Sequence, residues 1–189
     1  HRFLTRLALE NLFHRFQPFI LGQKLIAAKI AKQYKIDLIF YGESESEYGT
    51  ADSTKTFRDI SKKFFSVNSV EDLLLSGFKL KDLIKFTNTD LEDFRLYLPL
   101  NESEVENLQV MYLGHFLKWH PQSCYYYTVE NSDFISSPER NAGTYSKYSS
   151  LDDKLDDLHF YTSGIKFGIG RATHDASQEI RSGDINRDE

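Results

Sequence analysis

The sequence predicts an α/β fold, with part of a parallel sheet in residues 1–54 and a mainly helical region over residues 55–189. Apolar residues recur at helical spacing through most of the first 34 residues. The apolar run at 36–41 follows directly, and such a run after a helix is typical of a parallel strand covered on both faces. Beyond residue 55 the apolar residues recur mainly in short helical patterns.

The N-terminal elements follow from local signals. Phe3, Leu4, Leu7, Ala8 and Leu12 share one helical face. A second helix is predicted to start near Pro18, which has no N–H to leave unpaired in a first turn, and to run to about Tyr34. The strand over 36–41 then ends at Gly42.

The remaining elements are shorter. We expect helices at 70–75, 80–86 and 91–98, where Ser69 and Thr89 or Asp90 are available as caps and Pro99 is a stop. Weak alternation at 110–116 is compatible with a strand, and the tyrosine-rich segment 122–129 is ambiguous. A polar loop is predicted at 141–150, followed by helices at 151–161 and 173–181, the second ending near Gly183.

Composition narrows the classes of function. The chain has 189 residues, of which 40% are apolar, and a net charge of −5. Nucleic-acid binders normally carry a basic surplus, so we expect none here. No apolar run approaches the roughly 18 residues that a membrane span needs. Because the chain starts at His1 and its last residues look like the opening of a helix, we expect it to be a fragment.

A first candidate site follows the predicted strand. Glu43 and Glu47 lie beyond its end, with Gly42, Tyr48 and Gly49 around them. Ligands of open parallel sheets bind outside the carboxyl ends of the strands. Carboxylates there can hold Mg²⁺, orient an amine or bind sugar hydroxyls. Spacing alone favours the alternative, an ordinary exposed acidic loop.

A second candidate site precedes the last helix. Gly168 and Gly170 are flanked by Lys166 and Arg171. Free N–H groups at a helix start, next to two cations, suit phosphate oxygens. The pattern is not a Walker A loop, and the alternative is a plain helix start capped by Thr173.

The other reactive residue types indicate no further site. His115 and His120 have no matching carboxylate spacing, so no metal site is expected. Cys124, the single cysteine, lies in an apolar, tyrosine-rich segment and is interpreted as structural.

Four separated blocks of the chain resemble the N-acetyl sugar amidotransferase family. They are Phe16-Gln17-Pro18-Phe19-Ile20-Leu21-Gly22-Gln23-Lys24, then Phe40-Tyr41-Gly42-Glu43 with Glu47-Tyr48-Gly49, then Gly143-Thr144-Tyr145-Ser146-Lys147-Tyr148, and Ile165-Lys166-Phe167-Gly168-Ile169-Gly170-Arg171-Ala172-Thr173 running into Asp175-Ala176-Ser177. Their order spans nearly the whole chain. Members of this family serve the synthesis of bacterial O-antigen and flagellin sugars, including pseudaminic and legionaminic acids.

The resemblance implies a fold, a reaction and partners. The fold is that of the PP-loop ATP pyrophosphatases, with residues 1–54 as the C-terminal part of the ATPase domain and 55–189 contributing to the active site. The reaction converts an acetamido group of a free or nucleotide-activated sugar into an acetamidino group. ATP and Mg²⁺ are used, and ammonia arrives from a glutaminase partner in the cytoplasm.

The resemblance also assigns roles. Lys166 and Arg171 are expected to neutralise phosphate charge, and Glu43 and Glu47 to position the substrate, Mg²⁺ or ammonia. Asp175 caps the helix or orients Arg171. The remaining residues expected to bind substrate or nucleotide are Gly42, Tyr48, Gly49, Gly168, Gly170 and Thr173.

One departure from the family pattern leaves rival interpretations open. The family's Ser-Gly-Gly-Lys-Asp-Ser type phosphate loop is not present in these 189 residues. We therefore expect a C-terminal fragment that does not turn over alone. The rivals are a non-catalytic truncated copy that binds a partner, and another PP-loop enzyme such as a tRNA-modifying thiolase.

Overall fold

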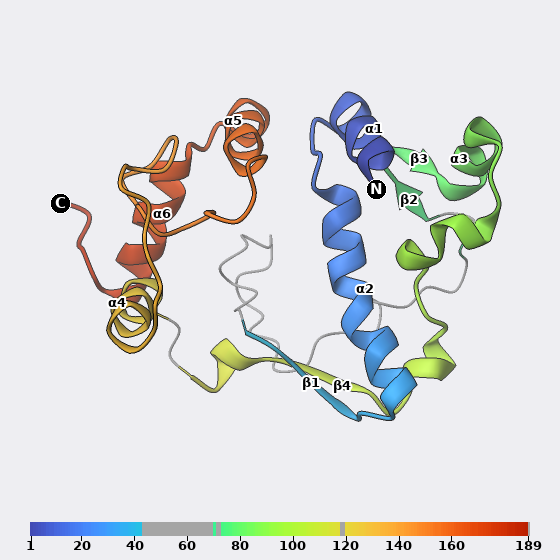
Figure 1. Cartoon of the computed structure of the whole chain (residues 1–189), viewed down its shortest axis with the longest axis horizontal. Helices are drawn as coiled ribbons and strands as arrows, with labels where there is room; N and C mark the ends of the chain where they lie inside the picture. The colour runs from blue at the N-terminus through green and yellow to red at the C-terminus, as the bar shows by residue number, and fades with distance from the viewer. Residues whose placement is uncertain (43–69, 71–72, 118–119, 189) are drawn as a thin grey trace. The chain divides into compact units, whose positions relative to one another are not determined.

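The computed structural model describes residues 1–42, 70, 73–117 and 120–188, which form two compact units. Unit 1 is His1–Leu117 and unit 2 is Lys118–Glu189, and each is described by itself (Figure 1).

Unit 1 begins with the two predicted helices. Helix α1 (Arg2–Leu12) ends where Phe13 turns into the left-handed region, and α2 (Gln17–Tyr34) ends in the same way at Lys35. Pro18 lies in the first turn of α2, where a missing N–H costs nothing. Both helices therefore lie where periodicity and Pro18 predict them.

The predicted strand is present and its pairing is parallel. Strand β1 (Leu38–Tyr41) pairs with β4 (Gln109–Tyr112), with Leu38 opposite Gln109 and Tyr41 opposite Tyr112. Ile39 and Tyr41 pack against the core beneath α2. Leu38 and Phe40, on the other face, are 43% and 47% exposed. Among the described residues, the expected cover is found on the face of Ile39 and Tyr41.

A hairpin begins within the segment 70–75 that was predicted to be helical. The helix prediction is therefore wrong for Leu74 and Leu75. Strands β2 (Leu74–Leu75) and β3 (Phe78–Lys79) are antiparallel. Between them Ser76 and Gly77 both have positive φ, 57° and 88°, which is the two-residue turn that suits a hairpin's twist. Leu74 and Leu75 therefore pair across a tight turn rather than continuing a helix.

Short elements complete unit 1. They are α3 (Leu80–Thr87), the 3-10 helices η3 (Leu91–Tyr97), η4 (Glu102–Val105) and η5 (Leu113–His115), and strand β4. Asp90 caps η3 as predicted, although η3 is 3-10 rather than α. The main core joins α1, the hairpin, α3 and η3 through Leu4, Leu7, Leu75, Leu80, Leu83, Phe94 and Tyr97.

Unit 2 contains three helices among its described residues, α4 (Pro121–Asn131), α5 (Asp156–Phe167) and α6 (Arg171–Ser182). The ambiguous tyrosine-rich segment is helical as α4. Helix α5 begins at Asp156, five residues later than predicted, because the Asp153 carboxylate accepts the Leu155 amide at 2.8 Å in a turn. Helix α6 is present as predicted, and Gly183 ends it at φ 82°.

The described part of the molecule is mostly helical with a small two-stranded parallel sheet. The PP-loop fold and the boundary at 54/55 stay predictions, and that boundary lies outside the described residues. Among the described helices, none combines the length and apolarity that crossing a membrane requires.

Candidate functional site

The candidate site lies in unit 2, where α5 gives way to α6. Gly168 ends α5 with φ 72°, and its amide bonds the Gly164 carbonyl at 2.9 Å. Gly170 is the N-cap of α6 in an extended conformation. The two glycines therefore end one helix and start the next, and a Cβ at either position would meet nothing within 4 Å.

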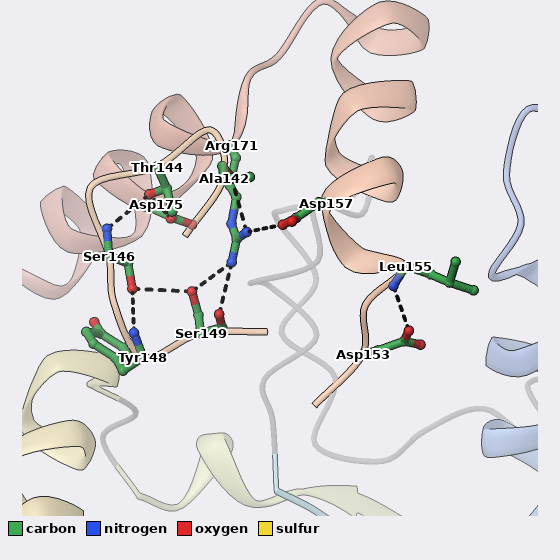
Figure 2. A network of polar contacts seen from close by, with 10 residues as sticks. All are labelled: Ala142, Thr144, Ser146, Tyr148, Ser149, Asp153, Leu155, Asp157, Arg171 and Asp175. Carbon is green, nitrogen blue, oxygen red and sulfur yellow. Dashed lines mark hydrogen bonds and ion pairs between the residues drawn. The ribbon is translucent and has the colours of Figure 1, made fainter. Parts of the chain in front are cut away.

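The first residue of α6, Arg171, is buried with 4% of its surface exposed. Its Nη1 donates to the Ala142 carbonyl at 3.3 Å. Its Nη2 donates to the carbonyl and the hydroxyl of Ser149, at 3.2 and 3.0 Å. One guanidinium thus binds both ends of the segment 142–149, which we call the 142–149 loop (Figure 2).

Helix α5 supports the same guanidinium. The Asp157 carboxylate lies 3.8 Å from Nη1, and the ring centre of Phe160 lies 4.1 Å from the guanidinium carbon. A buried cation is tolerated only where hydrogen bonds and opposite charge compensate its lost hydration. Arg171 has both. Its Nε alone finds no partner among the described residues.

The first turn of α6 also binds the 142–149 loop. The Ala172 amide donates to the Gly143 carbonyl at 3.0 Å. The Thr144 hydroxyl donates to the Asp175 carboxylate at 2.5 Å. One of the amides that made the helix start a candidate anion site is therefore satisfied by the protein's own backbone.

Asp175 is held as a carboxylate. Burial raises its pKa, but hydrogen bonds from His174 and Thr144 and the charge of Arg171 outweigh burial, so the pKa lies below its usual value. The sequence offers two roles for Asp175, capping the helix or orienting Arg171. In the structure its carboxylate accepts the Thr144 hydroxyl, a contact that fixes the 142–149 loop on α6.

Two tyrosines of the loop are stabilised in the protonated form. Burial, and then a hydrogen bond to the Glu179 carboxylate, raises the pKa of Tyr145. Burial and the charges of Glu179 and Asp175 raise the pKa of Tyr148 to about 12. Tyr148 stacks on Tyr125 of α4 with ring centres 4.3 Å apart and donates to Gln122 at 2.9 Å.

The other predicted site residues are more scattered. Lys166 is exposed in the last turn of α5, with Nζ 5.4 Å from the Phe167 ring centre. Thr173 is exposed within α6 and does not cap it, because Gly170 occupies the N-cap. Gly42 follows β1 in unit 1. The predicted site residues Glu43, Glu47, Tyr48 and Gly49 lie outside the described residues.

Sequence reasoning missed Asp157, Phe160 and Ser149 as partners of Arg171. The helical pattern puts Asp157 on an exposed face, and its side chain is indeed 65% exposed. The polar block at 143–148 is the only sequence signal for the loop. Searching the described residues for three or more His, Cys, Asp or Glu side chains able to hold a metal ion finds no such group.

Comparison with known proteins bears on this unit. Residues 142–189 match the family model described as LPS biosynthesis protein WbpG-like, C-terminal domain. A search of curated proteins gave no match. The matched segment contains Arg171 and the 142–149 loop, and it is similar to the C-terminal domain of a lipopolysaccharide biosynthesis protein.

Proposed function

We propose that the chain is the C-terminal portion of an ATP-dependent amidotransferase that converts an acetamido group of a bacterial surface sugar into an acetamidino group. The observation that carries the proposal is the match of residues 142–189 to the WbpG-like domain. The four separated blocks that resemble sugar amidotransferases extend the same assignment over the rest of the chain.

The reaction needs ATP because an amide oxygen is a poor leaving group and must be activated before ammonia can replace it. Attack of that oxygen on the α-phosphorus of ATP forms an O–P bond and releases pyrophosphate. Ammonia then forms a C–N bond at the activated carbon, and AMP leaves with the oxygen. Loss of a proton from the added nitrogen completes the amidine, so a base near the incoming ammonia is required.

The residues divide between the two halves of this chemistry. Glu43 and Glu47 position the substrate or ammonia and accept the proton, beside Gly42, Tyr48 and Gly49. Lys166 meets phosphate charge, beside Gly168, Gly170 and Thr173. In this proposal Glu43 and Glu47 help to hold Mg²⁺, and binding of ATP also needs the family's phosphate loop. Arg171 is enclosed by the 142–149 loop, so the proposal gives it no direct contact with phosphate.

Cellular context completes the proposal. The substrate is a free or nucleotide-activated N-acetyl sugar, and a glutaminase assembly in the cytoplasm supplies the ammonia. One rival is a non-catalytic copy that only binds a partner. The other, a tRNA-modifying PP-loop enzyme, is opposed by the net charge of −5.

The test uses the complete parent enzyme with ATP, ammonium and candidate nucleotide sugars, followed by mass spectrometry. We expect a product slightly lighter than its substrate, since an imino NH replaces a carbonyl oxygen, and stoichiometric AMP. If no N-acetyl sugar is converted while the protein stays folded, the amidotransferase assignment is wrong.

The role of Lys166 has its own test. Lys166→Met should lower kcat/KM for ATP by about a hundredfold, the scale of losing one charge-stabilising donor. Lys154→Met, which removes another exposed lysine of the same unit, is the matched control and should leave kcat/KM unchanged. Equal values for the two variants would remove Lys166 from the phosphate site.

A further inference from the structure

A serine, a histidine and an aspartate of unit 2 form a hydrogen-bonded chain where α4 begins. The Ser123 hydroxyl lies 2.8 Å from His120 Nδ1, and His120 Nε2 lies 2.9 Å from the Asp184 carboxylate. The side chains of His120 and Asp184 are only 18% and 22% exposed, whereas Ser123 is exposed. A nucleophile within hydrogen-bond reach of a base, with the base held by a third group, is the arrangement that nucleophilic catalysis uses.

Two helix ends bring these three side chains together. His120 is the extended N-cap of α4, and Ser123 lies three residues further on, in the first turn. Gly183 ends α6 at φ 82°, and the Asp184 amide then bonds the Glu179 carbonyl at 2.9 Å. Because this cap turns the chain after α6, the Asp184 carboxylate reaches the start of α4 (Figure 1).

The hydrogen-bond partners select one tautomer of His120. An ionised carboxylate only accepts hydrogen bonds, so Asp184 keeps the proton of the neutral imidazole on Nε2. Nδ1 then carries a lone pair and accepts the hydrogen bond of the Ser123 hydroxyl. His120 is therefore oriented as a general base for Ser123, and Asp184 fixes that orientation.

The surroundings of Ser123 suit a small ester. Backbone N–H groups in the first turn of a helix have no acceptor within the helix, so the amides of Gln122 and Ser123 are available to an oxyanion. Tyr126 and Tyr127 follow Ser123 by about one helical turn and are 57% and 68% exposed. Their rings offer an apolar surface beside the hydroxyl.

We propose that Ser123 is a nucleophile that takes the acyl group of a small carboxylic ester, with His120 as its base and Asp184 as a positioning residue. Ser123 Oγ forms a bond to the acyl carbon while its proton passes to His120. The ester C–O bond then breaks, and the leaving alkoxide takes that proton. Water attacks the acyl-enzyme in the same way and releases the acid and the serine. This reaction needs neither ATP nor ammonia, so it goes beyond the proposed function and fails independently of it.

Covalent labelling of the 189-residue chain tests the nucleophile, with p-nitrophenyl acetate and a fluorophosphonate as probes. We expect a burst of p-nitrophenolate and an adduct on Ser123, located by peptide mass spectrometry. Ser123→Ala should remove both. Ser132→Ala is the matched control at the other end of α4, where the hydroxyl bonds the Thr128 carbonyl, and it should react like wild type. An adduct that forms elsewhere, or no adduct on folded wild-type protein, overturns the proposal.

Separate variants test the roles of His120 and Asp184. His120→Gln removes the base, so acylation of Ser123 should slow by at least about a hundredfold. The new amide in Asp184→Asn can donate to Nε2 and leave the proton on Nδ1, which should slow acylation at least about tenfold. His115→Gln, in η5 of unit 1, is the control and should leave the rate unchanged.

Circular dichroism of each variant separates lost reactivity from lost folding. If His120→Gln does not fold, Asp184→Asn and the labelling of wild type carry the comparison. Equal acylation rates in wild type and in a folded His120→Gln or Asp184→Asn would show that these bonds only brace α4 against the end of α6, and would overturn the proposal.

Discussion

At the residue scale, Arg171 shows how a cation at a predicted helix start can have partners that the sequence does not reveal. Its position beside two glycines at a helix start suggests phosphate binding. In the structure, backbone carbonyls 22 and 29 residues away occupy its terminal nitrogens. A carbonyl acceptor leaves no mark in the sequence, because every residue has one. The location of Arg171 was therefore predictable, and its partners were not.

Asp175 carries a pH-dependent share of stability. Its folded pKa lies below the usual 3.8, so its stabilising effect is complete above about pH 4 and is lost as pH falls through the folded pKa. Asp175→Asn should cost about 1–2 kcal/mol at pH 7. The difference from wild type should shrink below about pH 4, as measured by urea unfolding at several pH values. A difference that is constant with pH would show that the charge plays no part.

At the element scale, the hairpin β2–β3 shows why the helix predicted at 70–75 is wrong at its end. A short apolar run does not distinguish strand from helix, and the decisive signal is the following Ser76-Gly77 pair. Ser76 is fully buried, yet its hydroxyl donates to the Leu4 carbonyl at 2.9 Å and its amide to Gln17 at 2.9 Å. Tertiary contacts with α1 and α2 thus fix a turn that local propensity left open.

Gly77 is the position where this turn tolerates least change. Its φ is 88°, and an added Cβ would lie 2.6 Å from the Asn11 Cβ. Gly77→Ala should lower the free energy of unfolding by about 3 kcal/mol, since strain and overpacking act together. Gly42→Ala in the same unit meets nothing within 4 Å and is the control. Chemical denaturation compares them, and equal stability would contradict the close approach of the turn to α1.

Long segments with a regular apolar spacing were predictable from the sequence. The start of a helix that depends on the turn before it was not. Helices α1, α2 and α6 and strand β1 follow from spacing, Pro18 and Gly183. Helix α5 begins late because a side-chain turn at Asp153 competes with helix formation. The acidic candidate site at Glu43 and Glu47 stays a prediction.

At the scale of the whole molecule, the net charge of −5 yields a direct prediction. RNA filter binding at moderate salt should show no tight, salt-sensitive association, because few phosphates would be neutralised. A basic RNA-binding domain measured alongside serves as positive control. Tight binding that weakens steeply with salt would instead favour a tRNA-modifying enzyme.

The pairing of β1 with β4 also bears on the whole molecule. Segments far apart in the sequence form a parallel ladder, with Ile39 and Tyr41 against the core and Leu38 and Phe40 outward. The apolar run at 36–41 correctly indicated parallel pairing. It did not indicate which strand is the partner, because weak alternation at 110–116 marked the second strand only in outline.

Because Arg171 and Ala172 bind main-chain oxygens, the two ends of the 142–149 loop are anchored through backbone atoms, while Thr144 and Tyr148 add side-chain contacts. Substitutions of the exposed Tyr145 can therefore change the surface of the loop while its backbone keeps the same path.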